Sequence, residues 1–175
     1  SEILRDIHMN ILITGASQGL GLELARSALK RGYHVFAVAH HVSPELGKLQ
    51  GETCSIHTAD ITSAADVDRV YGEIGQETEN LDYLFNNAGV WLDKSRVSLT
   101  DPSFSFDDVS RQFEVNAVGP LRVTRTFLPA DFTYMIRKWN VLFRKPRILH
   151  NWKVKKLLLD FFPLFPDKFF LVFCF

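Results

Sequence analysis

The chain has 175 residues, with 20 Lys and Arg against 20 Asp and Glu, so its formal net charge is +0. This balance argues against a dedicated binder of nucleic acid or acidic substrates. The neutrality is composite, because residues 1–130 hold 11 basic and 17 acidic residues, a balance of −6, whereas residues 131–175 hold 9 and 3, a balance of +6. All 10 glycines precede residue 131. We therefore treat the two segments as separate units.

The bulk composition describes one globular domain in a reducing compartment. The chain is 46% hydrophobic and 23% charged, and its length suffices to bury a core. Cys54 and Cys174 are too few for a disulfide framework and form no CxxC pair, so no metal site is predicted. No signal-peptide pattern opens the chain, which favours the cytoplasm. Residues 1–8 precede the first apolar run at Met9 and are interpreted as an N-terminal extension.

Strand-like runs alternate with helical patterns between residues 9 and 130. Gly32 is a helix C-cap signal, while Ser63 with Asp66 resembles a capping box, and Ser105 with Asp108 repeats that pattern. The predicted elements are a strand at 10–14, a helix at 19–31, strands at 33–39 and 53–58, a helix at 64–79, a strand at 81–85 and a long helix after Ser105. This order predicts an α/β fold with a doubly wound parallel sheet covered on both faces.

The long helix has apolar residues on one face. They are Phe106, Val109, Phe113, Ala117, Leu121 and Leu128. Such a stripe normally packs against another element of the fold.

Residues 131–175 form a basic, aromatic-rich tail with no regular period, and no sheet element can be assigned to it. An alternative interpretation is a membrane element, because residues 157–175 are apolar and follow Lys153, Lys155 and Lys156. Charged residues and prolines interrupt this run, which is shorter than the roughly 20 apolar residues needed to span a bilayer. We therefore expect neither membrane adhesion nor nucleic-acid binding, for which the tail has no recognisable module.

Residues 14–21, TGASQGLG, join the first strand to the first helix. Glycines allow a tight turn there and let a pyrophosphate approach helix N–H groups, although an ordinary turn is the alternative. The same order continues with Asp60-Ile61-Thr62 after the third strand, Asn86-Asn87-Ala88-Gly89 after the fourth, and Asn116 inside the long helix. Over about residues 9–129 this pattern resembles the short-chain dehydrogenase/reductase family, which implies a Rossmann-like domain.

The resemblance implies a site for a dinucleotide cofactor. Gly15, Ser17, Gln18, Gly19, Leu20 and Gly21 would bind its pyrophosphate and ribose, Asp60 and Ile61 would contact adenine, and Asn87, Ala88 and Gly89 would line the crevice. Asn116 would help hold a proton-relay water and is the one catalytic candidate. From the residues alone, Asp60 could be a cap, the NNAG segment a plain turn, and Asn116 a solvated side chain.

The end of the second strand bears on the choice between NAD and NADP. An acidic residue usually binds the ribose hydroxyls of NAD at this place, where this chain has His40-His41. His40 and Ser17 are therefore candidate contacts for a 2′-phosphate, and NADP is preferred over NAD. The alternative is that both histidines are surface residues. Trp91-Leu92-Asp93 and residues 111–116 look most like the C-factor and sniffer-like carbonyl reductase branch.

The family transfers hydride between nicotinamide and a carbonyl or alcohol, using a Ser and a Tyr-x-x-x-Lys. Tyr134 and Lys138 have that spacing, but only 18 residues separate Asn116 from Tyr134, too few for a helix end and a strand that carries the Ser. We therefore expect this chain to bind NAD(P)(H) without turning over a substrate. Small carbonyl or alcohol substrates are expected only for intact relatives.

The resemblance also predicts a truncated sheet, ending after the fourth strand and the long helix. The fourth strand would then be an open edge, and an apolar helix face would be bare, so self-association is expected. The alternative function is a noncatalytic interaction module that pairs with an intact relative through this edge.

Overall fold

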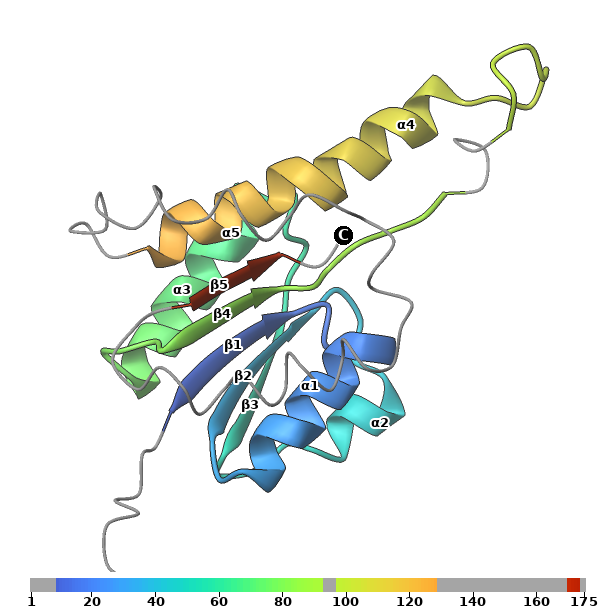
Figure 1. Ribbon diagram of the computed structural model, residues 1–175. Coiled ribbons are helices and arrows are strands. Elements are labelled where there is room, and N and C mark those ends of the chain that lie inside the picture. Colours follow the sequence, from blue (N-terminus) through green and yellow to red (C-terminus); the bar gives the residue numbers. More distant parts are fainter. Residues whose placement is uncertain (1–8, 93–96, 129–169, 174–175) are drawn as a thin grey trace, which may run out of the picture.

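Figure 1 shows the computed structural model of the chain, which describes residues 9–92, 97–128 and 170–173. Its centre is a parallel sheet in the order β3-β2-β1-β4-β5. The strands are β1 (Asn10–Thr14), β2 (His34–Ala39), β3 (Cys54–Thr58), β4 (Tyr83–Asn86) and β5 (Phe170–Phe173). The helices are α1 (Gly19–Lys30), α2 (Pro44–Gly47), α3 (Ala64–Glu77), α4 (Phe106–Phe113) and α5 (Gly119–Phe127). The predicted α/β fold is confirmed, with its first four strands in the order 3-2-1-4.

Helices cover both faces of the sheet (Figure 1), and an apolar layer lies between each set of helices and the strands. Ile11 and Ile13 of β1 belong to the layer beneath α1 and α2, whereas Leu12 between them belongs to the layer beneath α3 and α5. All three side chains are at most 1% exposed. This alternation explains the continuous apolar strands, because each face of the sheet is covered by helices.

Local capping signals placed most helix ends correctly. Gly32 follows α1 with φ +78°, as a C-cap glycine should. The hydroxyls of Ser63 and Ser105 accept hydrogen bonds from the N–H groups three residues on, at 3.2 and 3.1 Å. The short α2 was not predicted, although Ser43 caps it in the same way and Pro44 begins it.

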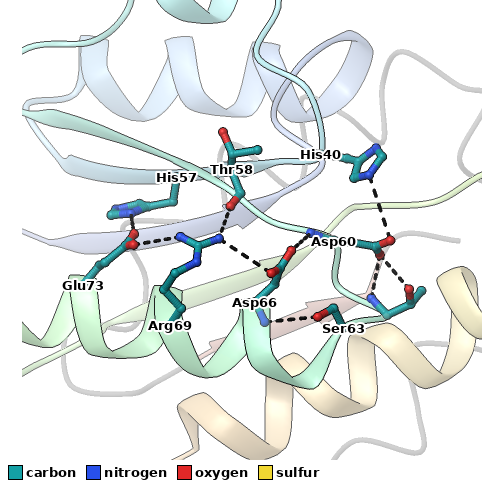
Figure 2. A network of polar contacts seen from close by, with 9 residues as sticks. His40, His57, Thr58, Asp60, Ser63, Asp66, Arg69 and Glu73 are labelled. Atoms are coloured by element: carbon teal, nitrogen blue, oxygen red, sulfur yellow. Dashed lines mark hydrogen bonds and ion pairs between the residues drawn. The ribbon is translucent and has the colours of Figure 1, made fainter.

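A chain of polar contacts fastens α3 to β3 (Figure 2). The ring Nδ1–H of His57, a residue only 7% exposed, donates to Glu73 at 2.7 Å. Arg69 donates to the other oxygen of Glu73 at 2.8 Å and to the carbonyl of Thr58 at 2.6 Å. One helix face thus supplies partners both to Nδ1 of a buried ring and to the carbonyl at the end of the strand, two polar groups that would be costly to bury alone.

The long helix changes its winding in the middle. A π-helical turn, Glu114–Val118, separates α4 from α5, and Pro120 lies in the first turn of α5. Proline has no N–H and its ring clashes with the carbonyl four residues earlier in a regular helix, so a wider turn before it relieves both problems. The helix therefore reaches Gly119-Pro120 through a π turn.

The predicted apolar stripe of this helix is largely exposed. Phe106, Phe113 and Leu121 are 74%, 63% and 62% exposed, while the residues of α5 that face the sheet are Val123 and Phe127. The expectation of a bare apolar helix face is met among the described residues. Self-association through it stays a prediction.

The expectation of an open sheet edge at the fourth strand is wrong. Residues 170–173 of the tail, to which no sheet element had been assigned, form β5 and pair in parallel with β4, from Tyr83 opposite Phe170 to Asn86 opposite Phe173. Strand pairing satisfies the N–H and C=O groups that an edge leaves unpaired. The described sheet is therefore not truncated after β4, and an interaction module based on that open edge is not supported.

Within the described residues, no helix is long and apolar enough to cross a membrane. Most of residues 157–175, on which the membrane interpretation rested, lie outside that part of the chain.

We predict that protonation of Glu73 weakens the attachment of α3. Hydrogen bonds from His57 and then Arg69 lower the pKa of Glu73, so the ionised carboxylate stabilises the fold at neutral pH, and this contribution is lost as the pH falls through the lowered value. The side chain is 40% exposed and solvent screens it, so Glu73→Gln should lower the free energy of unfolding by less than about 1 kcal/mol at pH 7.

Urea denaturation at pH 7 and pH 3 measures this effect, and the difference between Glu73→Gln and the unaltered protein should shrink at pH 3. Asp68→Asn, at an exposed position of the same helix, is the matched control. An equal loss in Asp68→Asn at pH 7 would contradict the prediction.

Candidate cofactor-binding site

The candidate site lies at the carboxyl edge of the sheet, where β1, β2 and β4 end beside one another. The turn after β1 leads into α1 at Gly19, and the turn after β4 is formed by residues 87–89. Parallel strands bring their carboxyl ends to one edge, so groups as far as 74 positions apart in the chain meet there. Ligands of open α/β sheets bind in this crevice.

Gly15 and Gly21 allow the two turns to touch through their backbones. Gly15 has φ +67°, and a Cβ atom there would lie 2.6 Å from the Cα of Ala88. A Cβ atom on Gly21 would overlap the carbonyl of Gly15 and lie 2.5 Å from Nδ2 of Asn87. No other residue type fits either position without movement of the backbone.

Thr14 and Asn87 join the same two turns by hydrogen bonds. Nδ2 of Asn87 donates to the carbonyl of Thr14 at 3.1 Å and to that of Gly15 at 3.0 Å. In return, the Thr14 hydroxyl accepts from the N–H groups of Asn87 and Ala88, both at 3.1 Å. Thr14 is 1% exposed, so its hydroxyl serves the scaffold rather than a ligand.

The first turn of α1 faces the crevice without a side-chain cap. Gln18, its N-cap residue, makes no capping hydrogen bond, and the first turn contains no acidic residue. Gly19 has φ +56° and open space around its Cβ position. The side chain of Leu20 packs against the core, which leaves its backbone for any contact with a ligand. Uncapped N–H groups and the helix dipole at such an end favour an anion.

The end of β2 brings two histidines beside the loop after β1. The rings of His40 and His41 are both exposed, with centroids 4.2 Å apart, edge to face. The Ser17 hydroxyl donates to the carbonyl of His41 at 2.6 Å, and Ser43 donates in turn to the carbonyl of Ser17. Nε2 of His40 lies 4.0 Å from a carboxylate oxygen of Asp60 (Figure 2), a neighbour that the linear sequence did not indicate.

Asp60 and Ile61 form the loop between β3 and α3. Oδ1 of Asp60 accepts from the N–H and the hydroxyl of Thr62 at 2.9 and 2.7 Å. The backbone hydrogen bond from Thr62 is the main cause that lowers the pKa of Asp60, so its carboxyl is ionised at neutral pH. Ile61 is 6% exposed, and a Cβ atom on Gly119 would lie 2.7 Å from its Cδ1, so its side chain is closed to a ligand. Its carbonyl accepts a hydrogen bond from Arg122 at 3.0 Å.

Asn116 lies in the π turn and holds the loop after β4. Its Oδ1 accepts from the N–H of Val90 at 2.8 Å, and its Nδ2 donates to the carbonyl of Val90 at 2.9 Å. Gly89 lies against this amide, because a Cβ atom there would be 3.3 Å from Oδ1. Both ends of the Asn116 side chain are thus engaged with protein backbone. Gln112, one turn earlier, accepts from the N–H of Leu92 at 3.0 Å in the same manner.

The structure therefore brings most of the sequence-predicted residues to one edge. Sequence reasoning missed Thr14 and Gln112, whose partners lie 20 or more positions away and leave no local pattern. Tyr134 and Lys138 lie outside the described residues. In the described part of the chain, no group of three or more His, Cys, Asp and Glu residues is arranged to hold a metal ion.

We predict that Gly21→Ala separates the two turns. The added methyl group would meet the Gly15 carbonyl and the Asn87 amide, so the free energy of unfolding should fall by roughly 2 kcal/mol or more, the usual cost of overpacking and strain. Gly75→Ala is the matched control, because nothing lies within 4 Å of that Cβ position in α3. It should raise stability by up to about 1 kcal/mol through helix propensity. Thermal unfolding of both variants tests this, and similar losses would contradict it.

Comparison with known proteins agrees with the geometry. The chain is 32% identical over 135 residues to a fatty acyl-CoA reductase of Acinetobacter baylyi, covering 74% of this chain and 43% of that protein. The structure of a carbonyl reductase from Pseudomonas aeruginosa is 35% identical with TM-score 0.58, covering 67% of this chain and 54% of that one. This chain thus spans less than half the length of that curated relative.

Two further structures hold a cofactor. A 3-ketoacyl-(acyl-carrier-protein) reductase from Brucella melitensis complexed with NADH is 28% identical with TM-score 0.60, covering 69% of this chain and 49% of that one. A Burkholderia multivorans protein with bound NADP is 29% identical with TM-score 0.60, covering 68% and 52%.

The sequence model that matches is described as short chain dehydrogenase, and the match covers residues 9–138. With the glycine-lined turn after β1, the NNAG turn after β4 and the strand order 3-2-1-4, this match identifies the chain as a member of the short-chain dehydrogenase family.

Proposed function

We propose that this chain binds a nicotinamide dinucleotide at the carboxyl edge of β1, β2 and β4. The observation that carries the proposal is the glycine cradle, in which Gly15 and Gly21 leave no room for a side chain beside Asn87 and Ala88. Ordering glycines in this close backbone contact costs conformational entropy. The contact places the uncapped start of α1 beside the crevice. A pyrophosphate is the anion that fits this arrangement in a doubly wound fold.

The proposed roles follow from which atoms remain open. Backbone N–H groups at Gly19 and Leu20 would bind the pyrophosphate, because Gln18 does not cap them. The free oxygen of Asp60 would accept from adenine, since Thr62 already occupies the other one. Asn116 would act by holding residues 89–90 beside the nicotinamide, not by touching it with its own side chain.

We propose a preference for NADP(H) over NAD(H). No carboxylate follows β2 directly, and the exposed rings of His40 and His41 lie beside Ser17, where a 2′-phosphate would approach. The nearby carboxylate of Asp60 opposes this preference, although its charge is offset by His40 when that ring is protonated. Solved relatives hold both kinds of cofactor, NADH in one structure and NADP in another.

Fluorescence titration of the purified chain with NADPH and NADH tests the cofactor and its type. We expect saturable binding of both, with NADPH bound roughly five-fold more tightly, the effect of one exposed charge-assisted contact. His40→Gln should reduce this ratio and leave the affinity for NADH unchanged, which serves as the internal control. Equal affinities in the unaltered protein would refute the preference, and no binding of either would refute the site.

We further propose that this chain does not turn over a substrate. The cofactor supplies or accepts a hydride when bound, but the reaction also needs a group that protonates the carbonyl oxygen. Tyr134 and Lys138 are the available candidates, and they follow Asn116 too closely for the intervening strand and Ser. Residues 91–93 and 111–116 favour the carbonyl reductase branch, so simple aldehydes and ketones are the substrates to test.

We predict no oxidation of NADPH by the purified chain in the presence of simple aldehydes or ketones. The absorbance of NADPH at its nicotinamide band should fall no faster than in a blank without protein, and Tyr134→Phe should change nothing. Turnover that Tyr134→Phe abolishes would show that Tyr134 is catalytic and that the proposal of inactivity is wrong.

A further inference from the structure

The first turn of α3 departs from the capping box that its sequence suggests. Ser63 caps the helix through its hydroxyl, which accepts from the N–H of Asp66. In a capping box the carboxylate of Asp66 would return to the N–H of Ser63. That N–H instead donates to the carbonyl of Asp60 at 3.0 Å, and the carboxylate reaches further, accepting from the N–H of Asp60 at 2.9 Å. The Asp66 carboxylate, which would accept within the helix turn in a capping box, thus accepts from the loop after β3 instead.

Arg69 holds the Asp66 carboxylate and the strand end together (Figure 2). Its guanidinium donates to the carbonyl of Thr58, the last residue of β3, and lies 3.9 Å from Oδ1 of Asp66. Glu73 accepts a hydrogen bond from the same guanidinium at 2.8 Å, and this second contact limits the rotation of the Arg69 side chain. The loop that begins after Thr58 is therefore tied to one face of α3 at two points, Thr58 and Asp60.

Asp60 is the residue that this arrangement orients. Asp66 takes its N–H, and the N–H and hydroxyl of Thr62 occupy its Oδ1. Its side chain is 44% exposed, and Oδ2 points toward Nε2 of His40, 4.0 Å away (Figure 2). An ionised carboxylate oxygen can only accept a hydrogen bond, so the group that it selects in a ligand is a donor. The exocyclic amino group of adenine is such a donor.

We propose that Asp66, steadied by Arg69, is a positioning residue that aims Asp60 at the amino group of the cofactor's adenine. This inference rests on the proposed cofactor site. Asp66 touches no ligand itself, and its effect is transmitted through the backbone N–H of Asp60. Loss of the Asp66 carboxylate frees that N–H and lets the loop 60–62 turn away, whereas loss of the Ser63 cap weakens the helix without removing the contact to Asp60.

The test compares NADPH with its deamino analogue, in which hypoxanthine replaces adenine and a carbonyl oxygen replaces the amino group. The unaltered protein should bind NADPH at least roughly five-fold more tightly than the analogue, because one hydrogen bond to a charged group is lost. Asp66→Ala should bring the ratio of the two dissociation constants close to that of Asp60→Ala, which has no carboxylate to aim. Asp66→Asn, which retains an acceptor oxygen, should restore most of the ratio.

Ser63→Ala is the matched control for stability, since it removes the other contact of the same helix turn. It should lower the melting temperature about as much as Asp66→Ala and leave the ratio unchanged. An unaltered ratio in Asp66→Ala, or an equal loss in Ser63→Ala, overturns the positioning role while the cofactor site stands. Failure of the unaltered protein to bind NADPH overturns the cofactor site and the positioning role with it.

Discussion

The backbone contact between the turn after β1 and the turn after β4 governs the geometry of the whole crevice. Gly15 approaches Ala88 with no side chain between them, and the Asn87 amide donates to the carbonyls of residues 14 and 15. Backbone atoms joined in this way have far fewer alternative positions than side chains would have. The start of α1 is therefore held at a constant distance from the end of β4, and any ligand must fit the space that the two turns leave.

The adenine side of the crevice is built by a different physical means. Side chains of α3 reach across to the loop after β3, where Asp66 and Arg69 hold Asp60 and Thr58. These contacts involve charged groups near the surface, so they respond to pH and salt in a way that the glycine contacts do not. The edge of the sheet is thus held on one side by backbone contacts between glycine-containing turns and on the other by contacts of charged side chains.

The long helix connects the two halves. Asn116 holds Val90 beyond the NNAG turn, and Gly119 lies against Ile61 beyond β3. Both contacts come from a stretch of helix that Pro120 forces into a wider turn. The π turn therefore helps to shape the crevice. Within four residues it places the Asn116 amide against the loop after β4 and Gly119 against the loop after β3.

The sequence by itself determined most of the elements and the family, because glycine spacing, apolar period and Ser caps act within a few residues of one another. Gly32 and Ser63 are examples, since each marks a helix end through its own backbone or hydroxyl. Only the tertiary structure decided that Asn87 bridges two carbonyls of the first turn, that Asp66 leaves its capping box for Asp60, and that residues 170–173 pair with β4. Most of these contacts join segments tens of positions apart, and even the short reach of Asp66 depends on how the loop folds back, so no local pattern records them.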